Sequence, residues 1–131
     1  MNACKELIDL SIRTHKIDLN RAYQEHLDMK WYMQQIINET NESINEIKPN
    51  NIPYLEDELG DVLWAWFMAV ENLKGLGYVR GHKEIINRCL KKYQERMLPL
   101  IGEKDYDEKI WKEVKGKQKI ALEEEMRKFN G

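Results

Sequence analysis

Pairs of carboxylates spaced three residues apart are the side chains of this sequence that are best suited to chemistry. Residues three apart on a helix share one face, with Cβ atoms about 5–6 Å apart, so both carboxylates of a pair can reach one divalent cation. Because 23 of the 131 residues are acidic, some pairs arise by chance, and the surroundings of each pair decide its meaning. Among these pairs are Glu25/Asp28, Glu39/Glu42, Glu58/Asp61 and Asp105/Glu108.

The pair Glu58/Asp61 stands at the start of an apolar run from Val62 to Val70. A helix that is apolar on every side is buried in a bundle or at a subunit interface. Ala65 and Met68 continue the face of Asp61, so we expect both carboxylates to point towards the interior. Burying an unpaired carboxylate is costly, so a cationic side chain, a metal ion or a proton must neutralise each one.

The alternative is that the acidic residues before the apolar run only interact with the positive end of the helix dipole. This explains Glu56 and Asp57 well. It explains Asp61 poorly, because Asp61 lies about two turns into the helix and the dipole effect fades after the first turn. The position of Asp61 therefore keeps a metal site as a candidate beside the helix-dipole interpretation.

The pair Glu39/Glu42 lies on the preceding helix. Glu39 and Glu46 flank the apolar stripe of this helix, and glutamates in such positions are usually exposed to solvent. The helices before and after the Lys48–Ile52 turn must, however, pack antiparallel. Each carboxylate pair is separated from the Lys48–Ile52 segment by about two turns of helix. We therefore expect the two pairs to lie side by side, at the same height along the helix pair. The stripe consists of Ile36, Ile37, Thr40, Ile44 and Ile47.

Four carboxylates at one level repel one another strongly unless a cation lies between them. Oxygen ligands are the ones that Mg²⁺ and Mn²⁺ prefer, whereas zinc sites are built mainly from nitrogen and sulfur. The sequence therefore predicts a site for Mg²⁺, with Mn²⁺ as a substitute, at Glu39, Glu42, Glu58 and Asp61.

The elements that position these residues are predicted to be helices, in an all-α antiparallel bundle of four to five helices. Gly and Pro are scarce, at seven and three, which favours long helices over a β-sandwich. Asp18 or Asn20 is a candidate N-cap for the second helix. Pro53 suits the first turn of the third helix, which Gly75 and Gly77 end. We expect one domain over residues 1–131, with helices at about 3–15, 20–47, 53–74, 82–97 and 105–128, the second of them with a candidate break near its middle.

Composition and charge exclude several function classes. The net charge of -2 gives no reason to expect a nucleic-acid partner, which usually requires a basic face. Cys4 and Cys89 form neither a disulfide framework nor a zinc motif. The first ten residues contain three charges and no apolar segment, so no signal peptide is expected. The longest apolar run has nine residues, against about 20 for a membrane span. We therefore expect a soluble, cytoplasmic protein without a membrane partner.

Two segments of the sequence together resemble a known enzyme family. Glu39-Thr-Asn-Glu42, followed by the run E-L-G-D-V-L from Glu58 to Leu63, is similar to the signature of the MazG-like all-α nucleoside triphosphate pyrophosphohydrolases. A later segment, Trp111 to Lys119, resembles the W-x-x-(I/V)-K-x-x-E-K pattern of these proteins, with Gln118 in place of the Glu. The resemblance extends over about residues 36–119, and we find no family landmark in residues 1–30.

The resemblance implies an activity, namely Mg²⁺-dependent cleavage of a nucleoside triphosphate to the monophosphate and pyrophosphate. It implies that the four carboxylates bind Mg²⁺, which would bridge the triphosphate and lower the pKa of an attacking water. A carboxylate not fully used by the metal would take the proton of that water, and Glu39 and Glu42 are both candidates. The nucleotide base and sugar are not specified by the sequence, nor is the number of metal ions.

The phosphates also need cationic partners. Lys92 and Arg96 share a face of the fourth helix because they are four residues apart. The family carries a K-x-x-R-R-H-P run here. The chain keeps the first Lys and the last Arg but has Glu95 at the first Arg, and its Pro comes one residue later. The alignment of this helix with the family run is therefore open, and Lys91 is a third candidate for phosphate binding. The alternative to phosphate binding is that these residues form an ordinary solvated basic face.

Two further expectations concern partners. The apolar run from Val62 to Val70 needs more cover than one small bundle provides, and the family resemblance also implies pairing, so we expect a homodimer or a dimer of dimers. The alternative function is a non-catalytic helical interaction protein. In that case the last helix, with Ile120, Leu122 and Met126 among many charges, would serve as a docking surface.

Overall fold

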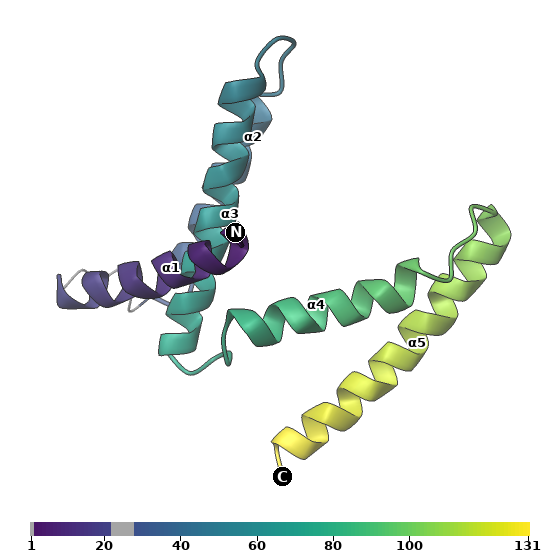
Figure 1. Cartoon of the computed structure of the whole chain (residues 1–131). Helices are drawn as coiled ribbons and strands as arrows, with labels where there is room; N and C mark the ends of the chain where they lie inside the picture. The colour runs from purple at the N-terminus through teal and green to yellow at the C-terminus, as the bar shows by residue number, and fades with distance from the viewer. Residues whose placement is uncertain (1, 22–27) are drawn as a thin grey trace. The chain divides into compact units, whose positions relative to one another are not determined.

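The computed structural model describes residues 2–21 and 28–131, and in these ranges it contains five α-helices and no strand (Figure 1). The predicted all-α fold is confirmed. The helices are α1 (Ala3–Asn20), α2 (Trp31–Asn45), α3 (Ile52–Gly75), α4 (His82–Met97) and α5 (Lys104–Phe129). They divide into two compact units, Met1–His82 and Lys83–Gly131. A single domain over the whole chain stays a prediction, and each unit is described by itself.

The helix α1 is longer than the sequence pattern predicted. Asn2 caps its N-terminus, since the Asn2 side chain accepts a hydrogen bond of 3.1 Å from the Lys5 amide. The helix then continues past His15 to Asn20, because no Gly or Pro interrupts it. Asp18 and Asn20 therefore lie in its last turn, and the expectation that one of them caps the second helix was wrong.

The helix α2 begins at Trp31, not near Asn20. Just before it, the Asp28 carboxylate accepts a hydrogen bond of 2.9 Å from the Lys30 amide. The expected helical segment at residues 22–27, with Glu25 of the Glu25/Asp28 pair, lies outside the described residues. No helix in the described ranges has both the length and the apolar character that crossing a membrane requires.

The turn between α2 and α3 is closed by Asn51. The Asn51 side-chain amide donates to the Glu46 carbonyl at 2.8 Å and to the Glu46 carboxylate at 2.7 Å. Asn50 has the left-handed φ of 57°, a conformation that Asn tolerates better than most residues. Pro53 lies in the first turn of α3 as predicted. The two helices pack against each other along their length (Figure 1).

The core of the first unit lies around the C-terminal half of α3, where every residue from Phe67 to Asn72 is buried. The helix α1 packs here as well. A Cβ at Gly75 would lie 3.0 Å from the His15 ring nitrogen Nε2, so glycine is what allows this close approach. At the start of α4, Nε2 of the buried His82 donates to the Phe67 carbonyl at 2.8 Å. These contacts fix the second half of α3.

The N-terminal half of α3 has less cover. Leu63, within the apolar run, is 47% exposed, and Leu59 one turn earlier is 53% exposed. The helix α2 packs against α3, whereas the His15 contact of α1 lies at the C-terminal end of α3. The expectation that the run is buried on every side therefore holds in this chain only from Phe67 onwards.

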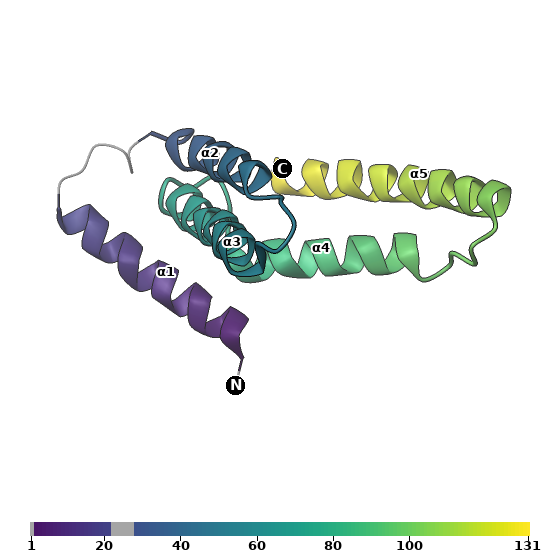
Figure 2. The same ribbon diagram turned by 90° about the horizontal axis from the view of Figure 1, so that it is seen from above.

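The second unit is a hairpin of α4 and α5 (Figure 2). Polar side chains link the two helices: Arg88 donates to both carboxylate oxygens of Glu125 at 2.9 and 2.8 Å. No residue from 83 to 131 is buried. A helix pair without buried apolar side chains gains little hydrophobic stabilisation by itself.

Candidate metal centre

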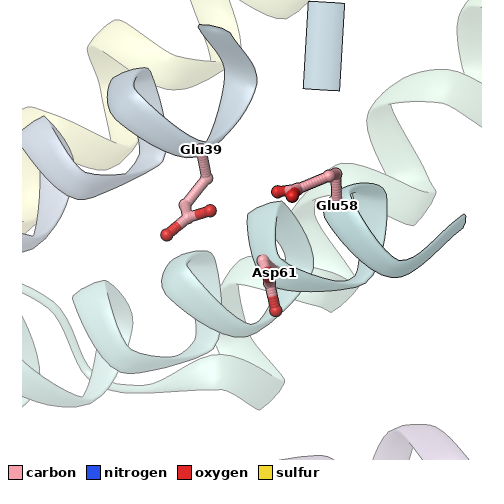
Figure 3. Close-up of side chains that lie close together, drawn as sticks. All are labelled: Glu39, Glu58 and Asp61. Carbon is pink, nitrogen blue, oxygen red and sulfur yellow. The ribbon is translucent and has the colours of Figure 1, made fainter. Parts of the chain in front are cut away.

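Three carboxylates from two helices converge beside the α2–α3 contact. One oxygen each of Glu39, Glu58 and Asp61 lies within 4.8 Å of the other two. Glu39 comes from α2 and points towards α3, while Glu58 and Asp61 come from α3, three residues apart (Figure 3). The three-residue spacing puts Glu58 and Asp61 on one face of α3. The turn that Asn51 closes determines which residues of α2 lie opposite them, and Glu39 is one of these.

The two glutamates are partly buried, and each has one buried carboxylate oxygen, Oε2, without a hydrogen-bond partner among the described residues. Partial burial raises the pKa of Glu39, and the negative charges of Glu42, Asp61 and Glu58 raise it further. Burial also raises the pKa of Glu58, followed by the charges of Glu42, Asp61 and Asp57. Both groups therefore resist ionisation without a cation nearby.

The fourth predicted ligand, Glu42, stands apart from this trio. Its side chain is exposed, and its oxygens are not within the mutual 4.8 Å of the other three. It is nevertheless a neighbour of Glu39 and Glu58, because it contributes to the raised pKa of each. All four predicted carboxylates therefore lie in one region of the α2–α3 hairpin, with three of them in closest contact.

These residues fit a divalent cation. All the donor atoms are carboxylate oxygens, the ligands of Mg²⁺ and Mn²⁺. The unpartnered oxygens of Glu39 and Glu58 would gain the positive partner that buried carboxylates need. Mg²⁺ is usually bound by one or two carboxylates together with water and substrate phosphates, so three or four carboxylates are sufficient.

Two expectations about orientation need correction. Asp61 is exposed in this chain, not directed into a buried interior, because the first half of α3 has little cover, as the exposed Leu59 and Leu63 also show. Glu39 and Glu46, which were expected to be exposed, are partly buried, whereas Ile37 and Ile44 of the apolar stripe are 54% and 58% exposed. The face of α2 that is partly or fully buried includes Glu39, Ser43 and Glu46.

The three predicted phosphate-binding residues are in the second unit, on α4. Lys91 and Lys92 are exposed, and Arg96 is partly buried. The Lys92 ammonium lies 5.7 Å from the centre of the Tyr93 ring. Arg96 and the Lys92 backbone carbonyl both contact α5 through Gln118. The role of these cations in phosphate binding stays a prediction.

Sequence reasoning missed the surroundings of Arg96. Its guanidinium carbon lies 5.7 Å from the centre of the Tyr93 ring and 5.2 Å from that of Trp111. The position of Tyr93, three residues before Arg96 on one helix face, was a signal available in the sequence. The contribution of Trp111 was not, because it depends on how α5 packs against α4.

Comparison with known proteins identifies the family. The family model of the MazG nucleotide pyrophosphohydrolase domain matches residues 13–98. No curated protein and no solved structure matches the chain significantly. The match begins at residue 13, within α1, so the family resemblance extends further towards the N-terminus than the expected start at about residue 36. It ends after α4, so the segment from Trp111 to Lys119 lies beyond it. Because the match covers more than half of the chain and includes the whole α2–α3 carboxylate region, the chain belongs to the MazG nucleotide pyrophosphohydrolase domain family.

Proposed function

We propose that this protein is a Mg²⁺-dependent pyrophosphohydrolase that cleaves a nucleoside triphosphate, or its deoxy form, to the monophosphate and pyrophosphate. The observation that carries the proposal is the convergence of Glu39, Glu58 and Asp61 within 4.8 Å, inside the segment that matches the MazG family. Family membership supports the reaction class, and the all-oxygen donor set supports Mg²⁺, with Mn²⁺ as a substitute.

Each carboxylate has a role in this proposal. Glu39, Glu58 and Asp61 hold the metal, with Glu42 as a fourth ligand or neighbour. When bound, Mg²⁺ supplies positive charge that neutralises the phosphates and lowers the pKa of a water molecule. Glu42 is the carboxylate outside the trio, so we assign to it the proton of the attacking water. The bond from the water oxygen to the α-phosphorus forms as the bond to the leaving pyrophosphate breaks.

Lys92 and Arg96 are the proposed partners of the phosphate chain, with Lys91 as the rival for the lysine position. Charge on the departing pyrophosphate grows in the transition state, so a positioned cation stabilises that state more than the bound substrate. Lys92 and Arg96 share one helix face, and both contact the same residue of α5. Lys91 lies about 100° around the helix from Lys92.

We further propose that the protein acts as a homodimer or a dimer of dimers. Exposed apolar side chains lie on both helices of the carboxylate hairpin, for example Ile44 on α2 and Leu63 on α3, at 58% and 47% exposure. The second unit buries no residue. Large exposed apolar surfaces mark protein interaction sites, and a second copy would cover them.

A substrate panel tests the proposed reaction. Canonical and deoxy nucleoside triphosphates are incubated with the protein and millimolar Mg²⁺, and pyrophosphate and monophosphate are quantified. We expect both products in equal amounts from at least one nucleotide, and no reaction in EDTA. The panel also identifies the base and sugar. Release of inorganic phosphate in place of pyrophosphate, or no turnover of any nucleotide, would contradict the proposal and favour a non-catalytic interaction protein.

A further inference from the structure

Gln118, on α5, is the residue through which α5 contacts the candidate phosphate-binding face of α4. Its side-chain carbonyl accepts a hydrogen bond of 2.8 Å from Arg96 Nε. Its amide nitrogen donates to the Lys92 carbonyl at 3.0 Å and to the Glu95 carboxylate at 3.1 Å. These hydrogen bonds to three residues of α4, Lys92, Glu95 and Arg96, fix the orientation of the Gln118 amide.

The Arg96 guanidinium is held from several sides. Tyr93 and Trp111 lie near it, with ring centres 5.7 and 5.2 Å from the guanidinium carbon. Only its Nε is bonded to Gln118, and within the described ranges the two terminal nitrogens have no hydrogen bond. These nitrogens form the pair of parallel donors that suits a phosphate group.

We propose that Gln118 is a positioning residue that holds Arg96 ready for the phosphate chain without neutralising its charge. A neutral amide fixes the guanidinium by one hydrogen bond and leaves its full positive charge for the substrate. A carboxylate in the same place would form an ion pair with Arg96 and compete with the phosphate. This inference rests on the proposed function of Arg96 and adds a residue that lies outside the family match.

The neighbouring Glu95 explains why the amide is needed. Glu95 and Gln118 both depart from the family patterns quoted above, and the Gln118 amide nitrogen lies 3.1 Å from the Glu95 carboxylate. A glutamate at position 118 would place two carboxylates in contact and raise the energy of both. The amide instead donates to Glu95 and accepts from Arg96, so the two departures compensate each other.

Steady-state hydrolysis of the best substrate tests the inference with three variants. Gln118→Ala removes the hydrogen bond to Arg96, and we expect KM to rise roughly 10-fold, as hydrogen bonds to charged groups are worth that much. Gln118→Glu should raise KM at least as far, because it adds an ion pair with Arg96 and repulsion from Glu95. The double variant Glu95→Arg with Gln118→Glu replaces that repulsion by attraction and should lie closer to wild type than Gln118→Glu alone.

The matched control is Arg88→Ala. It removes the two hydrogen bonds to Glu125, which link the same two helices at another level. We expect its KM to equal that of wild type. If Arg88→Ala raises KM as much as Gln118→Ala, the effect comes from loss of hairpin stability and the inference is overturned. A double variant no better than Gln118→Glu alone would also overturn the role given to Glu95.

A readout without catalysis is the NMR signal of the Arg96 Nε–H group, assigned by its loss in Arg96→Lys. We expect this signal to exchange slowly with solvent, to shift on titration with inorganic pyrophosphate and Mg²⁺, and to exchange faster in Gln118→Ala. Wild-type kinetics for Arg96→Ala would remove Arg96 from the proposed function. A raised KM for Arg96→Ala with unchanged KM and exchange for Gln118→Ala would overturn only the inference about Gln118.

Discussion

Glu39 of α2 and Glu58 of α3 approach each other across the hairpin, and each has a buried carboxylate oxygen without a hydrogen-bond partner in the described ranges (Figure 3). Two carboxylates in this arrangement repel each other and lose hydration, which raises the free energy of the folded chain. A bound cation reverses both effects. The same relationship therefore leads to predictions about catalysis, about stability and about pH.

We expect Glu58→Gln or Asp61→Asn to abolish hydrolysis and to leave the fold intact. Each change removes a negative metal ligand but keeps the size of the side chain. The metal-free variants should unfold at the same temperature as wild type or higher, because like charge has been removed from a crowded site. Pyrophosphate release and thermal unfolding followed by circular dichroism measure the two effects.

Glu56→Gln is the matched control for this pair of variants. Glu56 is an exposed acid two residues before Glu58 and is not among the converging carboxylates. We expect its turnover to stay near that of wild type. Wild-type turnover by Glu58→Gln or by Asp61→Asn would disprove the assignment of the site.

The metal-free protein should lose stability as the pH rises through the range in which Glu39 and Glu58 ionise. Folding raises the pKa of both groups above the ordinary value of 4.5, so the folded chain binds more protons than the unfolded chain in that interval. Their contribution to the free energy of unfolding is fully present below about pH 4.5 and is lost as the pH rises through the raised pKa values. Chemical denaturation in EDTA at a series of pH values measures it.

Two comparisons isolate this contribution. The double variant Glu39→Gln with Glu58→Gln should lack it, so its difference from wild type is the quantity to plot against pH. Millimolar Mg²⁺ should stabilise wild type at neutral pH, by about 2.7 kcal/mol when its concentration is 100 times the dissociation constant. If Mg²⁺ stabilises the double variant as much as wild type, these glutamates are not its ligands.

Glu39→Gln and Glu42→Gln are expected to fail in different ways. Glu39 belongs to the trio of close oxygens, so its substitution should weaken Mg²⁺ binding and raise the Mg²⁺ concentration needed for activity. Glu42 lies outside the trio, so its substitution should keep most of the Mg²⁺ affinity and lower kcat roughly 10²- to 10⁴-fold, as expected for loss of a general base. Isothermal titration with Mg²⁺ and saturation kinetics separate the two effects; the opposite result would exchange the roles.

Spacing and turn chemistry were enough to predict the carboxylate cluster. The Asn-rich turn fixes an antiparallel hairpin, and two acid pairs equally distant from it must meet, as Glu39 and Glu58 do. The buried face of α2 could not be predicted in this way. Apolar periodicity pointed to Ile37 and Ile44, which are exposed in this chain, because the side towards α3 is occupied by Glu39 and other polar residues. Hydrophobic patterning shows which face avoids water, not which partner covers it.

The exposed isoleucines lead to a prediction about assembly. We expect light scattering at micromolar concentration to give the mass of a dimer or a tetramer. Ile37→Glu should weaken the assembly, because it puts a charge into an apolar contact surface. Asn38→Glu is the matched control, since it adds the same charge about 100° around the same helix and should leave the mass unchanged. A strictly monomeric wild-type mass would contradict the proposed pairing.

The last prediction concerns which cations of α4 act on the phosphate chain. Arg96→Ala should raise KM and lower kcat, the latter on the order of 10²-fold, because charge on the departing pyrophosphate grows in the transition state. Mg²⁺ affinity should barely change, since carboxylates hold the metal.

Lys92→Ala should act in the same direction as Arg96→Ala, because Arg96 and the backbone of Lys92 both form hydrogen bonds with Gln118. Lys91→Ala should have a much smaller effect, because Lys91 lies about 100° around the helix from Lys92. Kinetics measured in parallel on the three variants decide which residues of α4 face the phosphate chain. If Lys91→Ala alone is strongly impaired, the assignment of Lys92 and Arg96 is wrong, while the carboxylate site is unaffected, since its residues lie on α2 and α3.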